Sequence, residues 1–167
     1  MKSVELYTDI QAEHGEGPIW DHLHQELYWV DIMQGRYFKA DYKTGKVDAF
    51  DLGQPLGVLG LCDNDQLIMG LKNGIGFWDE KKGKLNMVAG FPQYDDANIR
   101  FNDGAVSPGG SFFAGTMTFE GNEPKGVLYY FGSERKYIPV REGMYIPNGM
   151  RCNVERNKYF DTETIKQ

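Results

Sequence analysis

A repeat of roughly 45 residues constrains this chain more than any other feature of its sequence. Four short segments each place a glycine ahead of an apolar run, and these glycines stand at positions 17, 57, 104 and 149. The spacings between them are therefore 40, 47 and 45 residues. A period of roughly 40 to 50 residues is typical of a β-propeller blade, which usually has about four strands. The repeat predicts an all-β fold built from blades.

Within each unit, runs rich in β-branched and aromatic residues alternate with turn residues. The first unit predicts strands over 17–21, 27–31, 35–41 and 47–52. The second repeats the pattern after its opening strand over 66–71, 74–79 and 85–89. The third ends with strands over 126–131 and 137–140, and the fourth contains strands over 150–154 and 159–161. No segment shows a convincing helical pattern.

The length of 167 residues predicts a single domain. We expect it to cover 1–167 as a partial β-propeller, with blades at roughly 14–52, 55–92 and 98–141 and an incomplete blade at 145–167. This amounts to about three and a half blades, whereas a closed propeller has about four to eight. Two explanations stay open. A second chain completes the ring, or the sequence is a fragment of a longer protein, because a half ring would leave strand edges unpaired.

The stretch Asn98–Gly121 predicts a hairpin that carries a cluster of polar side chains. The run Ser107–Gly110 contains Pro-Gly-Gly, which favours a chain reversal. If the second strand folds back on the first, the polar residues at the two outer ends meet. These residues are Arg100, Asn102, Asp103 and Glu120. A cation, an amide and two carboxylates gathered at one end of a hairpin suggest a binding site.

The propeller repeat also predicts an ion site, because the innermost strands of all blades begin next to the central channel. Glu16, Asp103 and Asn148 each precede a repeat glycine and would converge there. Their oxygens are hard ligands, which favour Ca²⁺, Mg²⁺ or Mn²⁺ over softer metals. Each residue taken alone also fits a turn former or a solvated acid. Only the shared place in the repeat favours a ligand role.

Charge and hydropathy exclude several other functions. The net charge of −6 is spread along the chain and argues against a nucleic-acid partner. No apolar stretch is long enough to span a membrane, and the N-terminus lacks the apolar run of a secretion signal. We therefore expect a cytoplasmic protein in which Cys62 and Cys152 are free thiols. His22 and His24 are interpreted as part of a solvated hairpin tip.

Five motifs give the chain a resemblance to a known family. They are G-E-G-P-I-W at 15–20, L-Y-W-V-D at 27–31, R-F-N-D-G at 100–104, F-A-G-T-M at 113–117 and P-N-G-M at 147–150. In this order, over nearly the whole chain, they resemble the family of senescence marker protein 30 (regucalcin), gluconolactonases and luciferin-regenerating enzymes.

The resemblance implies a six-bladed propeller with one divalent cation in its channel, most simply Ca²⁺, with Zn²⁺, Mg²⁺ or Mn²⁺ as alternatives. It implies that Glu16 and Asn148 bind the cation and that Arg100, Asn102 and Glu120 contact a sugar lactone, which is hydrolysed. The family's general-base Asp has no counterpart in the sequence, so no catalytic residue is assigned. The alternatives are a calcium- or sugar-binding propeller without turnover and an inactive fragment.

Overall fold

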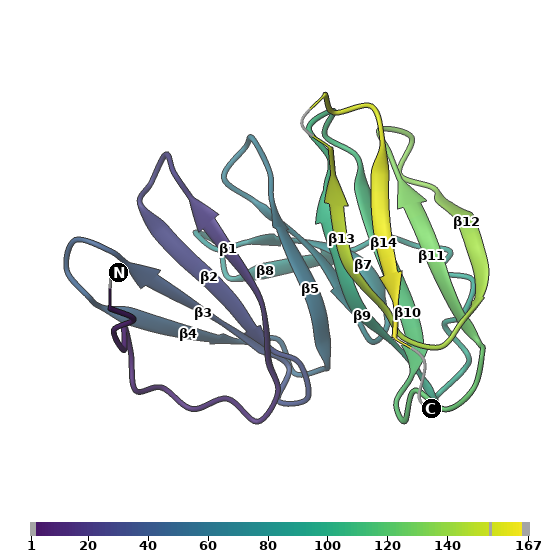
Figure 1. Ribbon diagram of the computed structural model, residues 1–167, viewed down its shortest axis with the longest axis horizontal. Coiled ribbons are helices and arrows are strands. Elements are labelled where there is room, and N and C mark those ends of the chain that lie inside the picture. Colours follow the sequence, from purple (N-terminus) through teal and green to yellow (C-terminus); the bar gives the residue numbers. More distant parts are fainter. Residues whose placement is uncertain (1–2, 154, 165–167) are drawn as a thin grey trace.

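The computed structural model describes residues 3–153 and 155–164, and all regular elements in these ranges are β-strands. Because the described part contains no helix, it contains none that could cross a membrane. The strands form three four-stranded sheets and one two-stranded sheet (Figure 1). Their bounds are β1 (Gly15–Asp21), β2 (Glu26–Asp31), β3 (Arg36–Asp41), β4 (Val47–Asp51), β5 (Leu56–Leu61), β6 (Leu67–Leu71), β7 (Gly74–Asp79), β8 (Lys84–Met87), β9 (Ile99–Val106), β10 (Phe112–Thr118), β11 (Gly126–Phe131), β12 (Tyr137–Met144), β13 (Pro147–Cys152) and β14 (Tyr159–Glu163).

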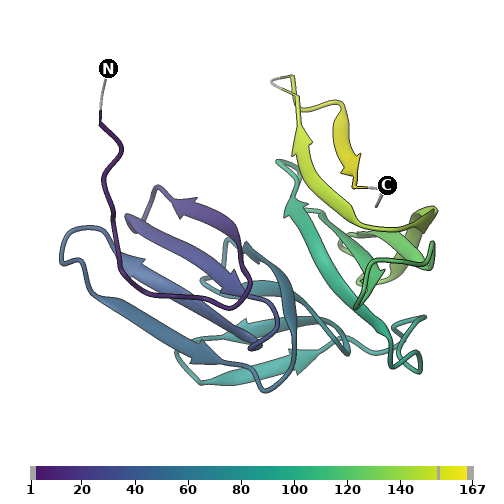
Figure 2. The same ribbon diagram turned by 60° about the horizontal axis from the view of Figure 1, so that its bottom comes forward.

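Each sheet is an antiparallel meander in which sequence neighbours pair, as expected for a propeller blade. The first strand of every sheet faces the same interior: β1 contacts β5, β5 contacts β9, and β9 contacts β13. The four sheets fan out in an arc, with the β1–β4 sheet at one end and the β13–β14 pair at the other (Figure 2). The chain is therefore an all-β partial propeller, which confirms the fold class predicted from the repeat.

The inner strands share an irregularity at matching places. In each of them, one extra residue interrupts the pairing with the next strand: between Glu16 and Ile19, Leu56 and Val58, Phe101 and Asp103, and Asn148 and Arg151. Such β-bulges bend a strand and turn its side chains to new directions, and they are common next to binding sites. The repeat thus extends from sequence spacing to the detailed shape of the strand that faces the interior.

Apolar side chains fill the space between successive blades. One cluster lies between the first two sheets and includes the fully buried Tyr37 and Leu59. A second joins the β5–β8 sheet to the β9–β12 sheet around Phe101 and Phe112, and a smaller one connects the β9–β12 sheet to Met150 of β13. Cys62 and Cys152 are half-buried and form no disulfide, as predicted. The inter-blade clusters hold the inner strands in place.

Several strand ends differ from those predicted. The strand expected over 137–140 continues to Met144, because its exposed residues still pair with β11 through two register shifts. An outer strand can be polar on both faces, so polarity does not mark its end. The strand expected over 150–154 begins earlier, at Pro147, and Val154 lies outside the described residues.

Candidate functional site

The predicted hairpin forms, with Arg100 near its open end and Asp103 opposite Gly115, nearer its middle. Strand β9 pairs with β10 so that Arg100 lies opposite Met117, and the pairing continues with a bond from the Phe119 amide to the Asn98 carbonyl (2.9 Å). The Gly110 amide donates to the Ser107 carbonyl (2.9 Å) and closes the turn. Glu120 follows directly and is exposed at the end of the hairpin where β9 begins.

Arg100 is buried without an ionic partner among the described residues. Only 3% of its surface is exposed. Its Nη1 donates to the Phe101 carbonyl (3.0 Å) and to Asn102 Oδ1 (2.8 Å), while its Nε has no hydrogen-bond partner in the described chain. Burial lowers the pKa of Arg100 because desolvation disfavours the charged form. A buried cation with an unused donor is costly unless a ligand or another group satisfies it.

Asn102 and Asp103 connect β9 to the start of β13. The Asn102 amide Nδ2 donates to the Pro147 carbonyl (3.0 Å), and Asp103 Oδ2 accepts from the Gly149 amide (2.6 Å). These two bonds flank Asn148, whose own Oδ1 accepts from the Gly149 amide at 3.2 Å. The structure therefore brings Arg100, Asn102 and Asp103 together with the segment that contains Asn148.

Glu16 lies apart from this group. It is exposed near the start of β1, and its carboxylate makes no hydrogen bond or salt bridge with any described residue. The sheet that contains β1 lies at the opposite end of the arc from β13 (Figure 2). An open groove of about 410 Å³ runs along the inner strands and is lined by 17–20, 58–61, 103–106 and Arg151. Glu16 directly precedes the part of β1 that lines this groove, and Asp103 lines it. A larger hollow of about 880 Å³ lies at the turns between the second and third sheets and is lined by none of the predicted site residues.

The positions of the β-bulges show which residues of the four inner strands are equivalent, more exactly than the spacing of the glycines does. Glu16, Leu56 and Asn148 each come just before the extra residue of their strand, whereas the residue in that position of β9 is Phe101. Asp103 lies two residues further on. Strand pairing therefore gives Asp103 a different place in the repeat from Glu16 and Asn148, although its hydrogen bond to Gly149 keeps it beside the β13 segment.

The donor atoms of the predicted ion site fit a hard cation. Glu16, Asp103 and Asn148 offer carboxylate and amide oxygens, which suit Ca²⁺ or Mg²⁺. Both Asp103 oxygens accept backbone amides, from Gly104 (2.7 Å) and Gly149 (2.6 Å), so the carboxylate is fixed while keeping further lone pairs.

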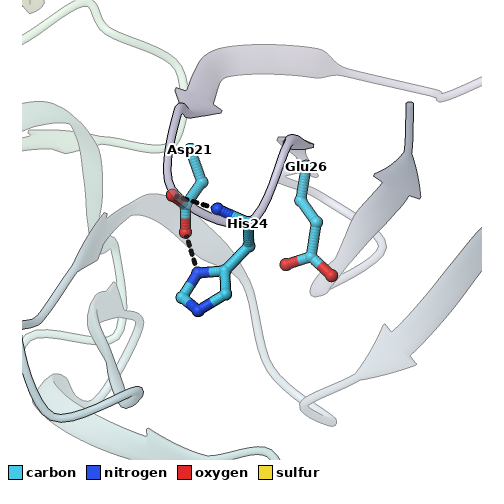
Figure 3. A group of neighbouring side chains, drawn as sticks. All are labelled: Asp21, His24 and Glu26. Atoms are coloured by element: carbon cyan, nitrogen blue, oxygen red, sulfur yellow. Dashed lines mark hydrogen bonds and ion pairs between the residues drawn. The ribbon is translucent and has the colours of Figure 1, made fainter. Parts of the chain in front are cut away.

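Sequence reasoning missed a second group of possible metal ligands, Asp21, His24 and Glu26 (Figure 3). His24 lies exposed in the hairpin turn, as the sequence predicts, but its ring also contacts Asp21. The signal that could have found the group is the predicted turn over 22–25, which would place the residues on either side of it, Asp21 and Glu26, opposite one another.

Comparisons with known proteins agree with the fold and its motifs. A 6-deoxy-6-sulfogluconolactonase of Pseudomonas putida is 31% identical over 150 residues, which cover 90% of this chain and 51% of that protein. The pentonolactonase XacC of Haloferax volcanii is 31% identical over 168 residues, covering 97% and 54%. The crystal structure of a calcium-binding protein, regucalcin, from Agrobacterium tumefaciens superposes with a TM-score of 0.89 at 20% identity, covering 95% of this chain and 53% of the other.

The chain spans about half the length of the curated relatives that it matches. Its residues 14–167 match the family described as the SMP-30/Gluconolactonase/LRE-like region, which is the family that the five motifs suggested. The match covers nearly the whole chain and includes every residue predicted for the site. This chain belongs to the SMP-30/gluconolactonase/LRE-like family.

Proposed function

We propose that this chain takes part in the hydrolysis of a sugar lactone, assisted by one divalent cation. Relatives named lactonases match it over nearly its full length, which supports hydrolase chemistry at the level of the family. Because these relatives are about twice as long, we further propose that additional blades complete the ring. They would come from a longer polypeptide or from a second copy of the chain.

The observation that carries this proposal is the environment of Arg100. Its guanidinium is buried, hydrogen-bonded to Asn102 and without a carboxylate partner among the described residues. The positively charged guanidinium of Arg100 and the side-chain amide of Asn102 are therefore held next to each other near the start of β9. Hydroxyl and carbonyl oxygens of a sugar lactone would supply the missing acceptors, because a guanidinium offers several donors in a fixed plane.

The predicted residues divide into those that contact the sugar and those that bind the cation. Asn102 and Glu120 orient the hydroxyls of the sugar, and Arg100 fixes the Asn102 amide while attracting electron-rich oxygen. Glu16, Asn148 and Asp103 would hold the cation, with Ca²⁺ as the first choice from their oxygen chemistry. When bound, such an ion supplies electrophilic stabilisation for oxygen atoms that gain negative charge.

The reaction itself exchanges one C–O bond for another. The oxygen of water forms a bond to the lactone carbonyl carbon, and the ring C–O bond breaks to leave an open-chain acid. Water loses a proton to a base, and the ring oxygen gains one as it leaves. The side chains of this chain bind and orient the lactone during these steps. The general base is not assigned to any of them.

A direct test measures gluconolactone hydrolysis by pH-stat, with the spontaneous rate subtracted, in the presence and absence of Ca²⁺, Zn²⁺ and Mn²⁺. We expect Asn102→Ala to lower kcat/KM roughly 10- to 100-fold, as is common when a hydrogen bond to substrate is lost. The matched control is Asn86→Ala, an exposed amide on the outer strand β8, which should behave as wild type. Glu16→Gln should weaken the response to the cation.

Binding is measured alongside turnover by saturation-transfer NMR with the same lactone, and sedimentation velocity gives the state of assembly. Binding without turnover, with binding reduced by Asn102→Ala, would assign the site to sugar recognition and refute hydrolysis by this chain. Equal rates for wild type, Asn102→Ala and Asn86→Ala, with or without metal, would refute the assigned site.

A further inference from the structure

A group of three metal-ligating side chains lies at the other end of β1 from Glu16. Asp21 is the last residue of β1, His24 lies in the following turn, and Glu26 is the first residue of β2. Asp21 and Glu26 are cross-strand partners, so the hairpin itself sets their separation. One ligand atom from each residue lies within 4.8 Å of those of the other two (Figure 3). With a rise of about 3.3 Å per residue, Asp21 is up to roughly 16 Å along the strand from Glu16.

The fold fixes both carboxylates of this group by hydrogen bonds. Asp21 is only 8% exposed, and its Oδ1 accepts from the amides of Leu23 (2.9 Å) and His24 (3.2 Å). Its Oδ2 remains for the imidazole and lies 2.8 Å from His24 Nδ1. Glu26 Oε2 accepts from the Tyr28 hydroxyl (2.7 Å). Hydrogen bonds of this kind orient metal ligands and reduce the cost of assembling them around an ion.

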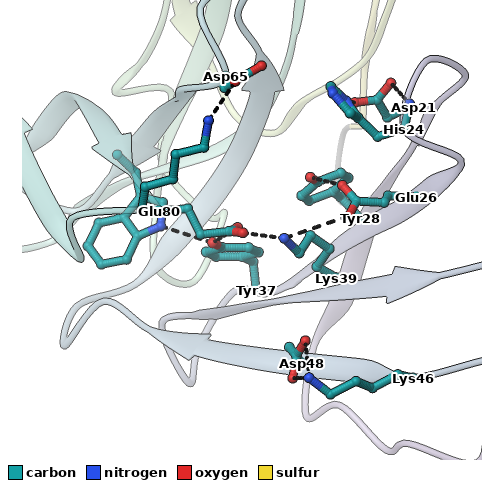
Figure 4. A network of polar contacts seen from close by, with 12 residues as sticks. Asp21, His24, Glu26, Tyr28, Tyr37, Lys39, Lys46, Asp48, Asp65 and Glu80 are labelled. Carbon is teal, nitrogen blue, oxygen red and sulfur yellow. Dashed lines mark hydrogen bonds and ion pairs between the residues drawn. The ribbon is translucent and has the colours of Figure 1, made fainter.

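The surrounding cleft carries an excess of negative charge. It has a volume of about 290 Å³ between the first two sheets, and it is lined by four carboxylates and two lysines, Asp21, Glu26, Asp65, Glu80, Lys39 and Lys81. Figure 4 shows the four acids with Lys39. Four negative charges against two positive leave a balance of −2 with a neutral His24.

The two lysines of the cleft form their shorter ion pairs with Asp65 and Glu80, and not with Asp21 or Glu26. Lys81 pairs with Asp65 (2.8 Å), and Lys39 pairs with Glu80 and approaches Glu26 only to 3.8 Å. No lysine pairs with Asp21 among the described residues. The negative charge that the lysines leave uncompensated is therefore concentrated beside His24, where a divalent cation would neutralise it.

We propose that Asp21, His24 and Glu26 bind a transition-metal ion of the Zn²⁺ type, at a site separate from the oxygen-ligand site at the start of the inner strands. An imidazole with two carboxylates suits Zn²⁺, whereas Ca²⁺ and Mg²⁺ prefer oxygen ligands alone. Three protein ligands leave the fourth position of a tetrahedral ion to water or to another molecule.

The movement needed to admit the ion is small. Bonds of about 2.0–2.2 Å in a tetrahedron place neighbouring ligand atoms about 3.3 Å apart. The contact between Asp21 Oδ2 and His24 Nδ1 at 2.8 Å would therefore open by about 0.5 Å as the ion replaces the shared proton. The His24 side chain is 56% exposed, so solvent surrounds much of the ring, while two backbone amides hold the Asp21 carboxylate. Glu26 closes the site from the neighbouring strand.

Zinc titration of the tag-free, metal-stripped chain tests the proposal by calorimetry. Excess Ca²⁺ is present to fill any site made of oxygen ligands alone. We expect one equivalent of Zn²⁺ to bind wild type, and His24→Gln and Glu26→Gln to weaken binding at least tenfold. His22→Gln is the matched control, because it removes an exposed histidine from the same turn, and it should bind as wild type. Glu16→Gln should also bind zinc normally, which separates this result from the proposed lactone chemistry.

Co²⁺ gives a second measurement. Visible absorption typical of tetrahedral Co²⁺ should develop for wild type and be lost in His24→Gln, with circular dichroism confirming that each variant is folded. Absence of zinc binding by wild type would overturn the proposal and leave the group as a hydrogen-bonded hairpin end. Equal weakening by His22→Gln and His24→Gln would overturn it as well.

Discussion

Asp31 is the most completely satisfied charged residue in the described chain. It is fully buried at the end of β2 and accepts the amides of Glu13 (3.1 Å) and His14 (3.0 Å). The Arg36 guanidinium adds two bonds from the start of β3, through Nε (3.2 Å) and Nη2 (3.0 Å). One carboxylate thus fastens the segment before β1 to the rest of its sheet and fixes the entry to Glu16.

These contacts determine how Asp31 responds to pH. Desolvation by burial raises its pKa, but the bonds from the His14 amide, Arg36 and the Glu13 amide outweigh it, so that the pKa falls below its ordinary value of 3.8. A lowered folded-state pKa means that the charged form stabilises the fold above about pH 4. This contribution is lost as the pH falls through the lowered pKa.

We predict that Asp31→Asn lowers the free energy of unfolding by about 2 kcal/mol at pH 7, because an amide cannot accept four charge-assisted bonds. The difference from wild type should narrow below pH 4. Urea unfolding at several pH values measures both effects. Asp48→Asn is the control, since this partly exposed acid pairs only with the exposed Lys46 among the described residues. A difference that stays constant from pH 7 to pH 3 would contradict the assignment.

At the scale of the element, the first turn of each sheet shares one backbone feature. The turn from the first to the second strand contains a residue with positive φ in every sheet: Gln25, Asp65, Gly110 and Arg156. Three of these are not glycine and tolerate a left-handed backbone that ordinarily costs an L-residue about 1–2 kcal/mol. The positive φ therefore recurs with the place in the turn and not with the residue type, and glycine at 110 avoids this strain in the β9–β10 hairpin.

Substitutions in that hairpin turn should separate backbone strain from side-chain contact. Gly110 has φ +81 and open space where a Cβ would lie, so Gly110→Ala should cost about 1 kcal/mol through backbone strain alone. Gly109→Ala is the matched control, because its φ is not positive and its Cβ would meet only Ser107 Oγ at 3.8 Å. Chemical denaturation of both variants provides the measurement. Equal losses at the two positions would show that strain at Gly110 is not the cause.

Comparison of sequence and structure explains which features of an element can be predicted. Turn residues and alternating apolar strands act locally, which is why the hairpin at 98–121 and the order of the strands were predicted correctly. The bulges depend on pairing with another strand, and no local pattern marks them. The burial of Arg100 and the contacts of Asp31 with Glu13 and His14 likewise arise only when distant segments pack together.

At the scale of the whole molecule, tyrosine hydroxyls connect the second sheet to both of its neighbours. Tyr37 of β3 donates to Glu80 Oε2 (2.8 Å), beside the pair of Glu80 with Lys39 (Figure 4). It accepts from Trp78 Nε1 (2.9 Å). Tyr137 of β12 accepts the Ile75 amide (2.8 Å) and donates to the Val88 carbonyl (3.2 Å). The blades are therefore joined by directed polar contacts as well as by their apolar clusters.

This coupling predicts that loss of one inter-blade contact destabilises the whole arc. Tyr137→Phe would leave the Ile75 amide unpaired and should lower the free energy of unfolding by about 1–2 kcal/mol. The chain's three tryptophans, Trp20, Trp29 and Trp78, all lie in the first two sheets, so their fluorescence reports on blades other than the one that carries Tyr137. If the sheets unfold together, the urea midpoints from fluorescence and from far-UV circular dichroism should fall by the same amount.

Tyr94→Phe is the control, because Tyr94 is exposed and its hydroxyl forms no hydrogen bond with the described residues. It should leave both midpoints unchanged. A shift confined to circular dichroism would instead mean that the β9–β12 sheet separates before the first two sheets unfold. Equal shifts of both midpoints would show that the inner strand β9, which carries Asn102 and Asp103, unfolds together with the outer strand β12 of its own sheet and with the first two sheets.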